Sequence, residues 1–395
     1  MEVNMKNKIT FKQIKIGIVI LIVLSGYLST FQYAYSNPKD LNMFIAKKTE
    51  KALTVGMSVA FIEDDQIVKR GNYGYADKED GIHVDDKTIF QIGSISKTIT
   101  ATAIMQLYEQ GIIDLDTDIN AYLDIDIVNP KSPDVPITIR SLLNHTSGLK
   151  DNMEVLHGVY SYNDTERKVP LTLRDFQLAY LLPNGEFYDE DINFYKLEQG
   201  KKEYSNVAYA LLGYLVEVVT ETPFNEYCNA SIFQPLSMDD TGWFLSEVDT
   251  NRLTYPYFKG KEKLPHYSSP TYPDGMLKTT VEDYSKFLTA TMNKGIYEDV
   301  RILQESSVNA MLNSSDGLGL GWDTKVLEEF LINTKGVKIV GHAGGDPGVF
   351  CLTFYNPLNK KGVIMFSNTD TTFNLRMLNS LDIIKRLIVE SGVYE

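Results

Sequence analysis

The chain has 395 residues, of which 43% are hydrophobic and 23% are charged. A sequence of this length and composition can bury a large core, so we expect a folded globular protein rather than a disordered one. The formal net charge at pH 7 is −14, with 38 Lys and Arg against 52 Asp and Glu. This balance argues against a nucleic-acid partner, because nucleic-acid binding requires clustered basic side chains that release counterions.

Residues 1–36 have the pattern of a secretory signal peptide. Lysines come first, an apolar run follows at 16–24, and Ala34-Tyr35-Ser36 places small residues where a signal peptidase cleaves. The alternative is an uncleaved anchor, because the uncharged stretch 16–36 approaches the roughly 20 residues of a membrane-spanning helix. In both cases we expect residues 37–395 to lie outside the cytoplasm, secreted or at the cell surface, with the N-terminal segment as the only membrane contact.

Strands are expected near both ends of the chain, and helices flank them. In chain order, the pattern predicts a helix, two strands, three further strands and a last helix at 40–52, 57–62, 66–75, 337–341, 349–355, 362–368 and 373–390. The turn Glu63-Asp64-Asp65 joins the first two strands. Between the two groups of strands, residues 111–315 show helical and loop patterns with no strand series of their own.

A serine and a lysine lie one helical turn apart after the first two strands. Residues 88–93 form an extended apolar run, and the pattern predicts a helix from Ser94 to Gly111. Positions i and i+3 share one helix face, so the Ser94 hydroxyl and the Lys97 amine can form a hydrogen bond. Serine alone is a weak nucleophile. Burial and the helix dipole disfavour the ammonium form of Lys97, whose neutral amine can then accept the serine proton.

Two further motifs follow and give the sequence a family resemblance. Tyr204-Ser205-Asn206 precedes an apolar helical pattern, and His342-Ala343-Gly344 opens a glycine-rich run. With Ser94 to Lys97, this order resembles the SxxK, YxN and K/H-[T/S]-G motifs of serine β-lactamases and penicillin-binding proteins. The resemblance is nearest to the group of class C β-lactamases, D-alanyl-D-alanine carboxypeptidases, D-aminopeptidases and related esterases. It extends over about 56–368, and further matching segments are 142–149, 235–238 and 274–280.

The resemblance implies roles for the matching residues. Ser94 would attack a carbonyl carbon and become acylated, and Lys97 and Tyr204 would move its proton, with either of them as the base. Asn206 would hold the substrate amide and Lys97. The backbone N–H groups of Ser94 and Gly345 would stabilise the oxyanion.

The third motif departs from the family pattern at its middle position. His342 and Gly344 are expected at the substrate-binding site, but Ala343 replaces the usual threonine or serine, whose hydroxyl helps relatives to hold a substrate carboxylate. A neutral His342 in place of lysine would weaken anion binding further. β-Lactamase and carboxypeptidase activities, which recognise that carboxylate, are therefore less favoured than aminopeptidase, endopeptidase or esterase activity. His83, His157 and His266 have no partners at ligand spacing, so no zinc site is expected, and no cofactor is expected either.

The resemblance also implies an α/β (α+β) fold: a five-stranded antiparallel sheet flanked by the terminal helices, with an inserted mainly helical lobe. Residues 37–395 would form one catalytic domain, with the lobe at about 111–315 and the active site at the seam. This indicates an extracytoplasmic serine hydrolase acting through an acyl-enzyme. Its small-molecule or peptide substrate would be an amide, peptide or ester that contains a D-amino acid, a cell-wall peptide or a secreted peptide metabolite. The alternatives are a β-lactamase or esterase of the same group, and a non-catalytic binder of envelope polymer.

Several other residues carry weaker expectations. Residues 152–194 resemble the family least and are expected either to frame the substrate cleft or to form a surface insertion. Within them, the acidic run 188–191 is expected to be solvated or to face a cationic substrate. His145 is expected to be a hydrogen-bonded structural residue. Cys228 and Cys351 permit a disulfide, but two buried free thiols are the favoured interpretation.

Overall fold

The computed structural model describes residues 40–162, 171–198, 201–313, 319–330, 332–334, 336–370 and 377–395. The predicted signal or anchor segment, residues 1–36, lies outside the described residues. So does the first part of the helix that the sequence predicts over 373–390.

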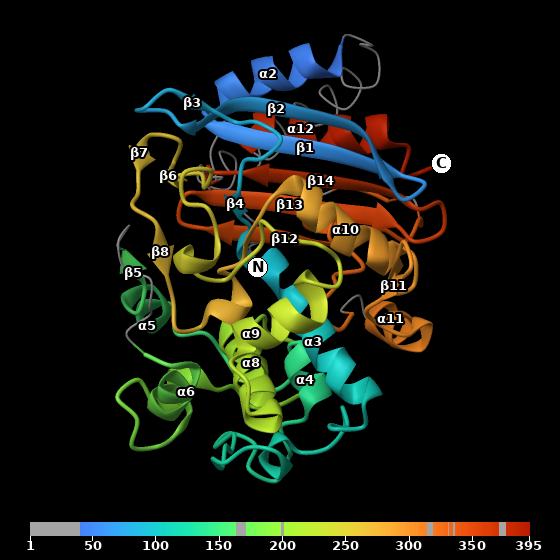
Figure 1. The fold of residues 1–395 in the computed structure, drawn as a ribbon. Coiled ribbons are helices and arrows are strands. Elements are labelled where there is room, and N and C mark those ends of the chain that lie inside the picture. The colour runs from blue at the N-terminus through green and yellow to red at the C-terminus, as the bar shows by residue number, and fades with distance from the viewer. Residues whose placement is uncertain are drawn as a thin grey trace, which may run out of the picture.

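A six-stranded antiparallel sheet forms the centre of the molecule (Figure 1). Its strand order is β12-β13-β14-β1-β2-β3, so strands from both ends of the chain share one sheet. The strands are β1 (Gly56–Glu63), β2 (Gln66–Asp77), β3 (Ile82–His83), β12 (Val340–Asp346), β13 (Val349–Asn356) and β14 (Lys361–Ser367). The predicted antiparallel sheet is confirmed, and the two-residue strand β3 adds a sixth strand at its edge.

The burial of each strand explains its place in this sheet. β1 is buried over its whole length except Glu63, as expected for a central strand with apolar residues on both faces. The first half of β2 alternates between exposed and partly buried residues, which is typical of a strand with one solvated face. Asp64 and Asp65, at the hairpin between β1 and β2, have positive φ angles of 48° and 67°. Aspartate tolerates this backbone conformation, and a tight hairpin requires it.

Helices cover both faces of the sheet. They are α2 (Leu41–Ala52), α10 (Val281–Met292) and α12 (Met377–Ser391). α2 and α12 lie together over one face (Figure 1), where they share an apolar cluster with Val59 and Phe61 of β1. α10 contacts β1 and β14, and the alternate residues Ala60 and Ile62 belong to the larger apolar cluster on that side. The predicted first and last helices are confirmed over the described residues, and the Asp40 carboxylate caps α2 by accepting the Asn42 N–H.

The segment between the two groups of strands is mainly helical. Its helices are α3 (Lys97–Glu109), α4 (Ile139–Leu143), α5 (Met153–Gly158), α6 (Leu173–Leu181), α7 (Glu190–Asn193), α8 (Asn206–Thr220), α9 (Phe224–Cys228) and α11 (Glu305–Leu312). α8 is buried from Val207 to Val216 and contacts α3, α4, α6 and α9. Among the described residues no single helix is long and apolar enough to cross a membrane, and only the pair Asn206–Thr220 and Phe224–Phe233, bent by 82°, has that length and composition together.

Short strand pairs supplement these helices. β4 (Phe90–Gln91) pairs with β9 (Lys278–Thr279), β5 (Ser161–Tyr162) with β8 (Tyr267–Ser268), β6 (Tyr257–Phe258) with β7 (Glu262–Lys263), and β10 (Ile296–Tyr297) with β11 (Val300–Arg301). Each consists of two residues per strand, so within the described part of 111–315 the strands form no extended sheet. Cys228 and Cys351 are both buried and free, as the sequence favours.

Two predicted boundaries near the serine are wrong. The helix expected from Ser94 starts as a short 3-10 helix, Gly93–Ser96 (η1), and α3 begins only at Lys97. The strand expected over 337–341 is instead β12, which contains the whole third motif. Its glycines suggest a loop, but they allow close pairing with β13: a Cβ on Gly341 would lie 2.1 Å from the Thr353 carbonyl oxygen.

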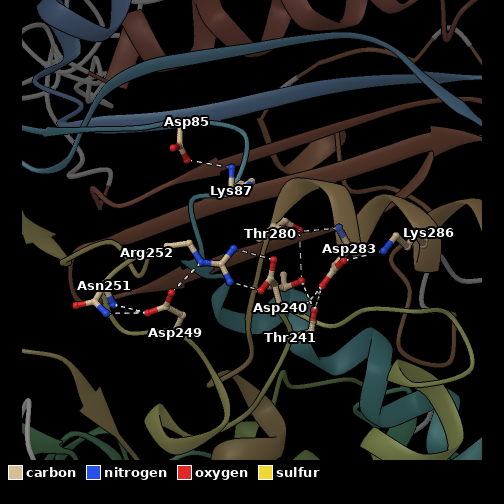
Figure 2. Close-up of polar contacts among 11 residues, drawn as sticks. Asp85, Lys87, Asp240, Thr241, Asp249, Asn251, Arg252, Thr280, Asp283 and Lys286 are labelled. Carbon is tan, nitrogen blue, oxygen red and sulfur yellow. Dashed lines mark hydrogen bonds and ion pairs between the residues drawn. The ribbon is translucent and has the colours of Figure 1, made fainter.

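A polar network joins the segment before β6 to the start of α10 (Figure 2). The buried Asp283 carboxylate accepts hydrogen bonds from the Asp240 backbone N–H at 2.7 Å and from the Thr241 hydroxyl at 3.1 Å. The Lys286 amine lies 2.9 Å from the other carboxylate oxygen. Asp283 therefore accepts from two segments at once. Its loss would leave the Asp240 N–H without this acceptor, whereas Thr241 keeps its contact with the Thr279 hydroxyl and Lys286 keeps its contact with the Ser237 backbone oxygen.

The variant Asp283→Ala is expected to lower the free energy of unfolding by about 1–3 kcal/mol, because the Asp240 N–H loses this acceptor and Thr241 and Lys286 each lose one hydrogen bond. Asp249→Ala is the matched control, since it removes an exposed ion-pair partner of Arg252 at the edge of the same network. The control should keep the wild-type Tm. Urea and thermal unfolding measure the stability of both variants. Equal stabilities would contradict the conclusion that Asp283 stabilises the contact between these two segments.

Candidate active site

Ser94 lies on η1, which connects β4 to α3 and packs backbone to backbone on β12. A Cβ on Gly93 would lie 2.8 Å from the Gly345 nitrogen, and one on Gly344 would lie 2.0 Å from the Ile92 carbonyl oxygen. Gly93 also has a positive φ of 54°, which glycine adopts at no steric cost. Glycine is therefore required where η1 contacts β12. Because of this contact, Ser94 and Gly345 line the same cavity.

The Lys97 amine is fully buried and makes three hydrogen bonds. Its Nζ lies 3.1 Å from Ser94 Oγ, 2.7 Å from Asn206 Oδ1 and 2.7 Å from the backbone oxygen of Asp274. The structure thus brings Ser94 and Lys97 into the contact that their spacing predicts. It adds Asn206 from the second motif and Asp274 from a segment between the second and third motifs.

Burial favours the neutral form of the Lys97 amine. Burial lowers the pKa of this amine, and the neighbouring carboxylates of Asp274, Asp151 and Asp346 oppose that effect only in part. A neutral amine has two hydrogens and one lone pair. It can therefore donate to Asn206 and Asp274 while its lone pair accepts the Ser94 proton, which is the arrangement of a general base.

Tyr204 stands over the same amine. The Lys97 Nζ lies 4.8 Å from the centre of the Tyr204 ring. The tyrosine is 46% exposed, since its side chain lines a cavity beside Ser94. Desolvation raises the pKa of the hydroxyl well above its ordinary value, and a hydrogen bond with Ser94 opposes this only in part. Tyr204 is therefore a neutral phenol, better suited to donate a proton to a leaving group than to serve as the base.

His145 supports the segment that carries Tyr204. Its Nδ1 accepts a hydrogen bond from the Ser205 backbone N–H at 3.1 Å, and its backbone oxygen accepts one from Glu203 at 3.0 Å. The imidazole packs on the Tyr204 ring with centroids 4.5 Å apart. Burial holds the pKa of His145 well below its usual value, so the ring is neutral. The prediction of a hydrogen-bonded structural histidine is confirmed.

The third motif offers no positive charge and no hydroxyl. His342 is buried, and burial lowers its pKa to about 4, so the imidazole is neutral at pH 7. Its Nδ1 lies 2.6 Å from the backbone oxygen of Ala343, which lines the cavity without a polar side chain. Gly344 packs closely against Ile92, since a Cβ on it would lie 2.0 Å from the Ile92 carbonyl oxygen, and it is not among the residues that line the two cavities beside Ser94. Its expected contact with substrate stays a prediction.

Two cavities flank Ser94. The Tyr204 cavity has a volume of about 370 Å³, and its lining includes Ser94, Tyr204, Trp322, Asp323, Glu329 and His342. The Asn206 cavity has a volume of about 250 Å³, and its lining includes Ser94, Leu156, Tyr160, Asn206, Asp274 and Asp346. Each is large enough for a small substituent of a substrate, so a carbonyl at Ser94 would extend into one cavity on each side.

Both cavities carry carboxyl groups. In the Asn206 cavity, burial raises the pKa of Asp346 to about 6 and that of Asp274 to about 7. In the Tyr204 cavity, burial and the neighbouring Asp323 raise the pKa of Glu329 to about 7. No Lys or Arg occurs among the described residues that line either cavity. The surroundings of Ser94 therefore become more negative as the pH rises through neutrality.

Within the segment 152–194, whose residues 163–170 lie outside the described part of the chain, the residues that line the cleft come from its first part. Leu156 and Tyr160 line the Asn206 cavity, and the Tyr160 hydroxyl donates a hydrogen bond to Asp346 Oδ1 at 2.8 Å. The acidic run 188–191 lines neither cavity, and its Asp191 pairs with Lys131 instead. Of the two predictions for this run, solvent exposure therefore fits the structure better than contact with a cationic substrate.

Sequence reasoning missed three residues of the site. Asp151 holds the Asn206 side chain, Asp274 accepts from Lys97 through its backbone oxygen, and Tyr160 reaches Asp346 from a distant segment. A weak signal existed for two of them. Asp274 begins one matching segment, and Asp151 stands just after another.

A serine hydroxyl in contact with a buried lysine amine, between two open cavities, defines a serine hydrolase. Over residues 41–383 the sequence matches the beta-lactamase family, and the chain belongs to that family. It is a serine hydrolase of the penicillin-binding-protein and β-lactamase type.

Individual relatives agree with this placement. Penicillin-binding protein 4* of Bacillus subtilis (strain 168) is 26% identical over 345 residues, which cover 82% of this chain and 71% of that protein. Protein flp of Staphylococcus aureus (strain MRSA252) is 21% identical over 352 residues, which cover 87% of this chain and 65% of that protein.

Solved structures show the same fold. The octameric penicillin-binding protein homologue from Pyrococcus abyssi has a TM-score of 0.71 and 24% identity, covering 89% of this chain and 77% of that chain. The D-amino acid amidase from Ochrobactrum anthropi SV3, in complex with L-phenylalanine amide, has a TM-score of 0.66 and 23% identity. The match covers 89% of this chain and 99% of that chain.

The variant Gly93→Ala is expected to slow fluorophosphonate labelling of Ser94 by about 100-fold, because its Cβ would force η1 away from the Gly345 nitrogen. Gly111→Ala is the matched control: φ is +69°, but no atom lies within 4 Å of its Cβ, so it adds backbone strain without a clash. The control should label at the wild-type rate. Equal rates for the two variants would show that the contact of η1 with β12 does not position the oxyanion donors.

Proposed function

We propose that this protein hydrolyses amides, peptides or esters that carry an amino group near the scissile carbonyl, with D-amino-acid derivatives as the favoured class. The observation that carries the proposal is the charge of the site. His342 is neutral, Ala343 has no hydroxyl, and carboxyl groups line both cavities. Such surroundings attract an ammonium group and repel the carboxylate of a penicillin or of a peptide C-terminus.

Acylation begins at Ser94. As its Oγ forms a bond to the carbonyl carbon, its proton passes to the neutral Lys97 amine, 3.1 Å away. The carbonyl electron pair moves onto oxygen, which accepts hydrogen bonds from the backbone N–H groups of Ser94 and Gly345. The negative charge thus develops beside two fixed donors and a newly formed ammonium.

Collapse of this intermediate breaks the bond to the leaving group. Tyr204 is the group placed to give the leaving nitrogen or oxygen a proton, and Lys97 then returns one to Tyr204. The leaving group accordingly occupies the Tyr204 cavity, and the acyl part lies beside Asn206 in the other cavity. Water then attacks the acyl carbon while Lys97 takes its proton. The bond from that carbon to Ser94 Oγ breaks, Lys97 returns the proton to Ser94 Oγ, and the acid leaves.

The acyl part determines the substrate class. In the Asn206 cavity, Asp274, Asp346 and Asp370 offer carboxyl groups to an ammonium on the acyl part, while Leu156 gives an apolar wall. An aminoacyl group with an apolar side chain fits both features. The likeness to a D-amino acid amidase and to penicillin-binding proteins supports a D-configured aminoacyl group.

The hydrogen-bonded arrangement of Ser94, Lys97 and Asn206 favours a hydrolase over a non-catalytic polymer binder, which has no use for a buried lysine. We propose further that the protein works outside the cytoplasm, on the basis of the pattern in residues 1–36. Mass analysis of protein recovered from the producing cells tests this: a chain that begins after residue 36, or a full chain in the membrane fraction, supports it, and a full chain in the cytosol contradicts it.

For substrates, D-phenylalanine amide is expected to exceed its N-acetyl counterpart in kcat/KM by about 10-fold or more, because acetylation removes the ammonium. The ratio should grow as the pH rises from 5 to about 7, and it should level off or fall above that because the α-amino group of the substrate then loses its own proton. Asp346, with a pKa of about 6, and Asp274, with a pKa of about 7, lose protons over this range and then attract the ammonium more strongly. Initial rates of ammonia release measure the ratio. An equal rate for both amides at every pH would contradict the proposal.

Penicillin provides the converse test. Intact mass after incubation with benzylpenicillin should show little or no adduct in the wild-type chain. The double variant H342K/A343T restores the lysine and hydroxyl of the family pattern and should form the adduct faster. Rapid acylation of the wild type would show that the altered motif still recognises a carboxylate.

A further inference from the structure

We infer that Asp151 is a positioning residue of this active site, which fixes the side-chain amide of Asn206 so that the amide oxygen faces Lys97. The inference rests on the proposed function, because it assigns one part of that mechanism. It concerns a residue that reaches the reacting atoms only through Asn206.

The Asp151 carboxylate is surrounded by donors from the start of α8. Its Oδ1 accepts from the Ser205 hydroxyl at 3.1 Å, the Asn206 N–H at 2.9 Å and the Val207 N–H at 3.1 Å. Its Oδ2 accepts from the Asn206 side-chain Nδ2 at 2.8 Å and again from the Asn206 N–H at 2.9 Å. Asp151 precedes Asn206 by 55 residues in the chain, so the contact joins two separate segments.

The chemistry of the two groups determines the orientation of the amide. The oxygen and the NH₂ of an asparagine have nearly the same shape, and their partners decide which way the amide points. An ionised carboxylate only accepts, so the NH₂ of Asn206 must face Asp151. The opposite end, Oδ1, then lies 2.7 Å from the Lys97 amine. A reversed amide would place oxygen against carboxylate and NH₂ against amine.

The negative charge has a second effect. The Asp151 carboxylate raises the pKa of Lys97, against the larger opposing effect of burial. The groups that face or electrostatically influence this amine are the carboxyls of Asp151, Asp274 and Asp346, the phenols of Tyr204 and Tyr209, and the imidazoles of His145 and His342. Of these, Asp151 is the one that also holds an acceptor of the amine in place.

The test is the variant Asp151→Asn in the full chain. Its oxygen can still accept from the N–H groups of α8, but its new NH₂ then opposes the Asn206 NH₂, and the Asn206 amide turns over. The rate of fluorophosphonate capture of Ser94 should fall about 10- to 100-fold at its optimum. The acid limb of the pH–rate profile should move to lower pH by about one unit or more, because Lys97 loses both a nearby negative charge and an acceptor.

Ser205→Ala is the matched control. It removes a hydrogen bond to the same carboxylate and the side-chain cap of α8, but it leaves the Asn206 amide held by Asp151. This variant should lose stability in thermal unfolding while its acid limb stays in place. If Asp151→Asn also keeps its acid limb and loses no more rate than Ser205→Ala, Asp151 is a helix-capping residue only and the inference is overturned.

A charge exchange provides the rescue. In N206D alone, two carboxylates would meet at the 2.8 Å contact, so capture should be slower than in the wild type. In D151N/N206D, the new amide can donate to the new carboxylate, whose second oxygen still accepts from Lys97. A carboxylate at position 206 raises the pKa of Lys97 in both N206D and the double variant, so the two are compared above their acid limbs. There the double variant should react faster than N206D, and a double variant that reacts no faster than N206D would contradict the inference. A wild-type chain that captures no fluorophosphonate refutes the proposed function instead, so the two failures are distinguishable.

Discussion

The site depends on one constraint, which is that the buried Lys97 amine must have every hydrogen-bonding position filled. A polar group buried without partners costs several kcal/mol, and a buried charge costs more. The amine has Ser94 Oγ, Asn206 Oδ1 and the Asp274 backbone oxygen within 3.1 Å. These partners come from η1, the start of α8 and the segment before β9. The fold is therefore arranged so that three distant parts of the chain meet at one nitrogen atom.

The same constraint connects catalysis to substrate choice. Burial lowers the pKa of Lys97, which favours its action as a base, and the nearby carboxyls of Asp274 and Asp346 limit that effect. Those carboxyls face the cavity beside Ser94, whereas His342 is held neutral by its own burial. The carboxyl groups that raise the pKa of Lys97 thus also make the electrostatic potential at the substrate site more negative. We propose that this negative potential favours a cationic substrate.

Features carried by local pattern could be predicted from the sequence. The central strand β1 is apolar over most of its length. Ser94 and Lys97 make the contact that their spacing predicts, even though the serine lies on η1 rather than on α3. Features that depend on distant pairing could not. Asp151 acquires its role from a helix that begins 55 residues later, and a glycine-rich motif becomes part of β12 only because β13 pairs with it. The pattern of residues 1–36 predicts export, and this stays a prediction.

The most direct test of the account is the intact mass of the full chain during incubation with a fluorophosphonate, compared with Ser94→Ala and Lys97→Met. A single adduct that maps to Ser94 is expected on the wild-type chain. No adduct is expected on Ser94→Ala, and labelling of Lys97→Met, which lacks the base, should be strongly slowed. Labelling of Ser94→Ala at the wild-type rate, or of Lys97→Met as fast as the wild type, would contradict the claim that a buried lysine activates this serine.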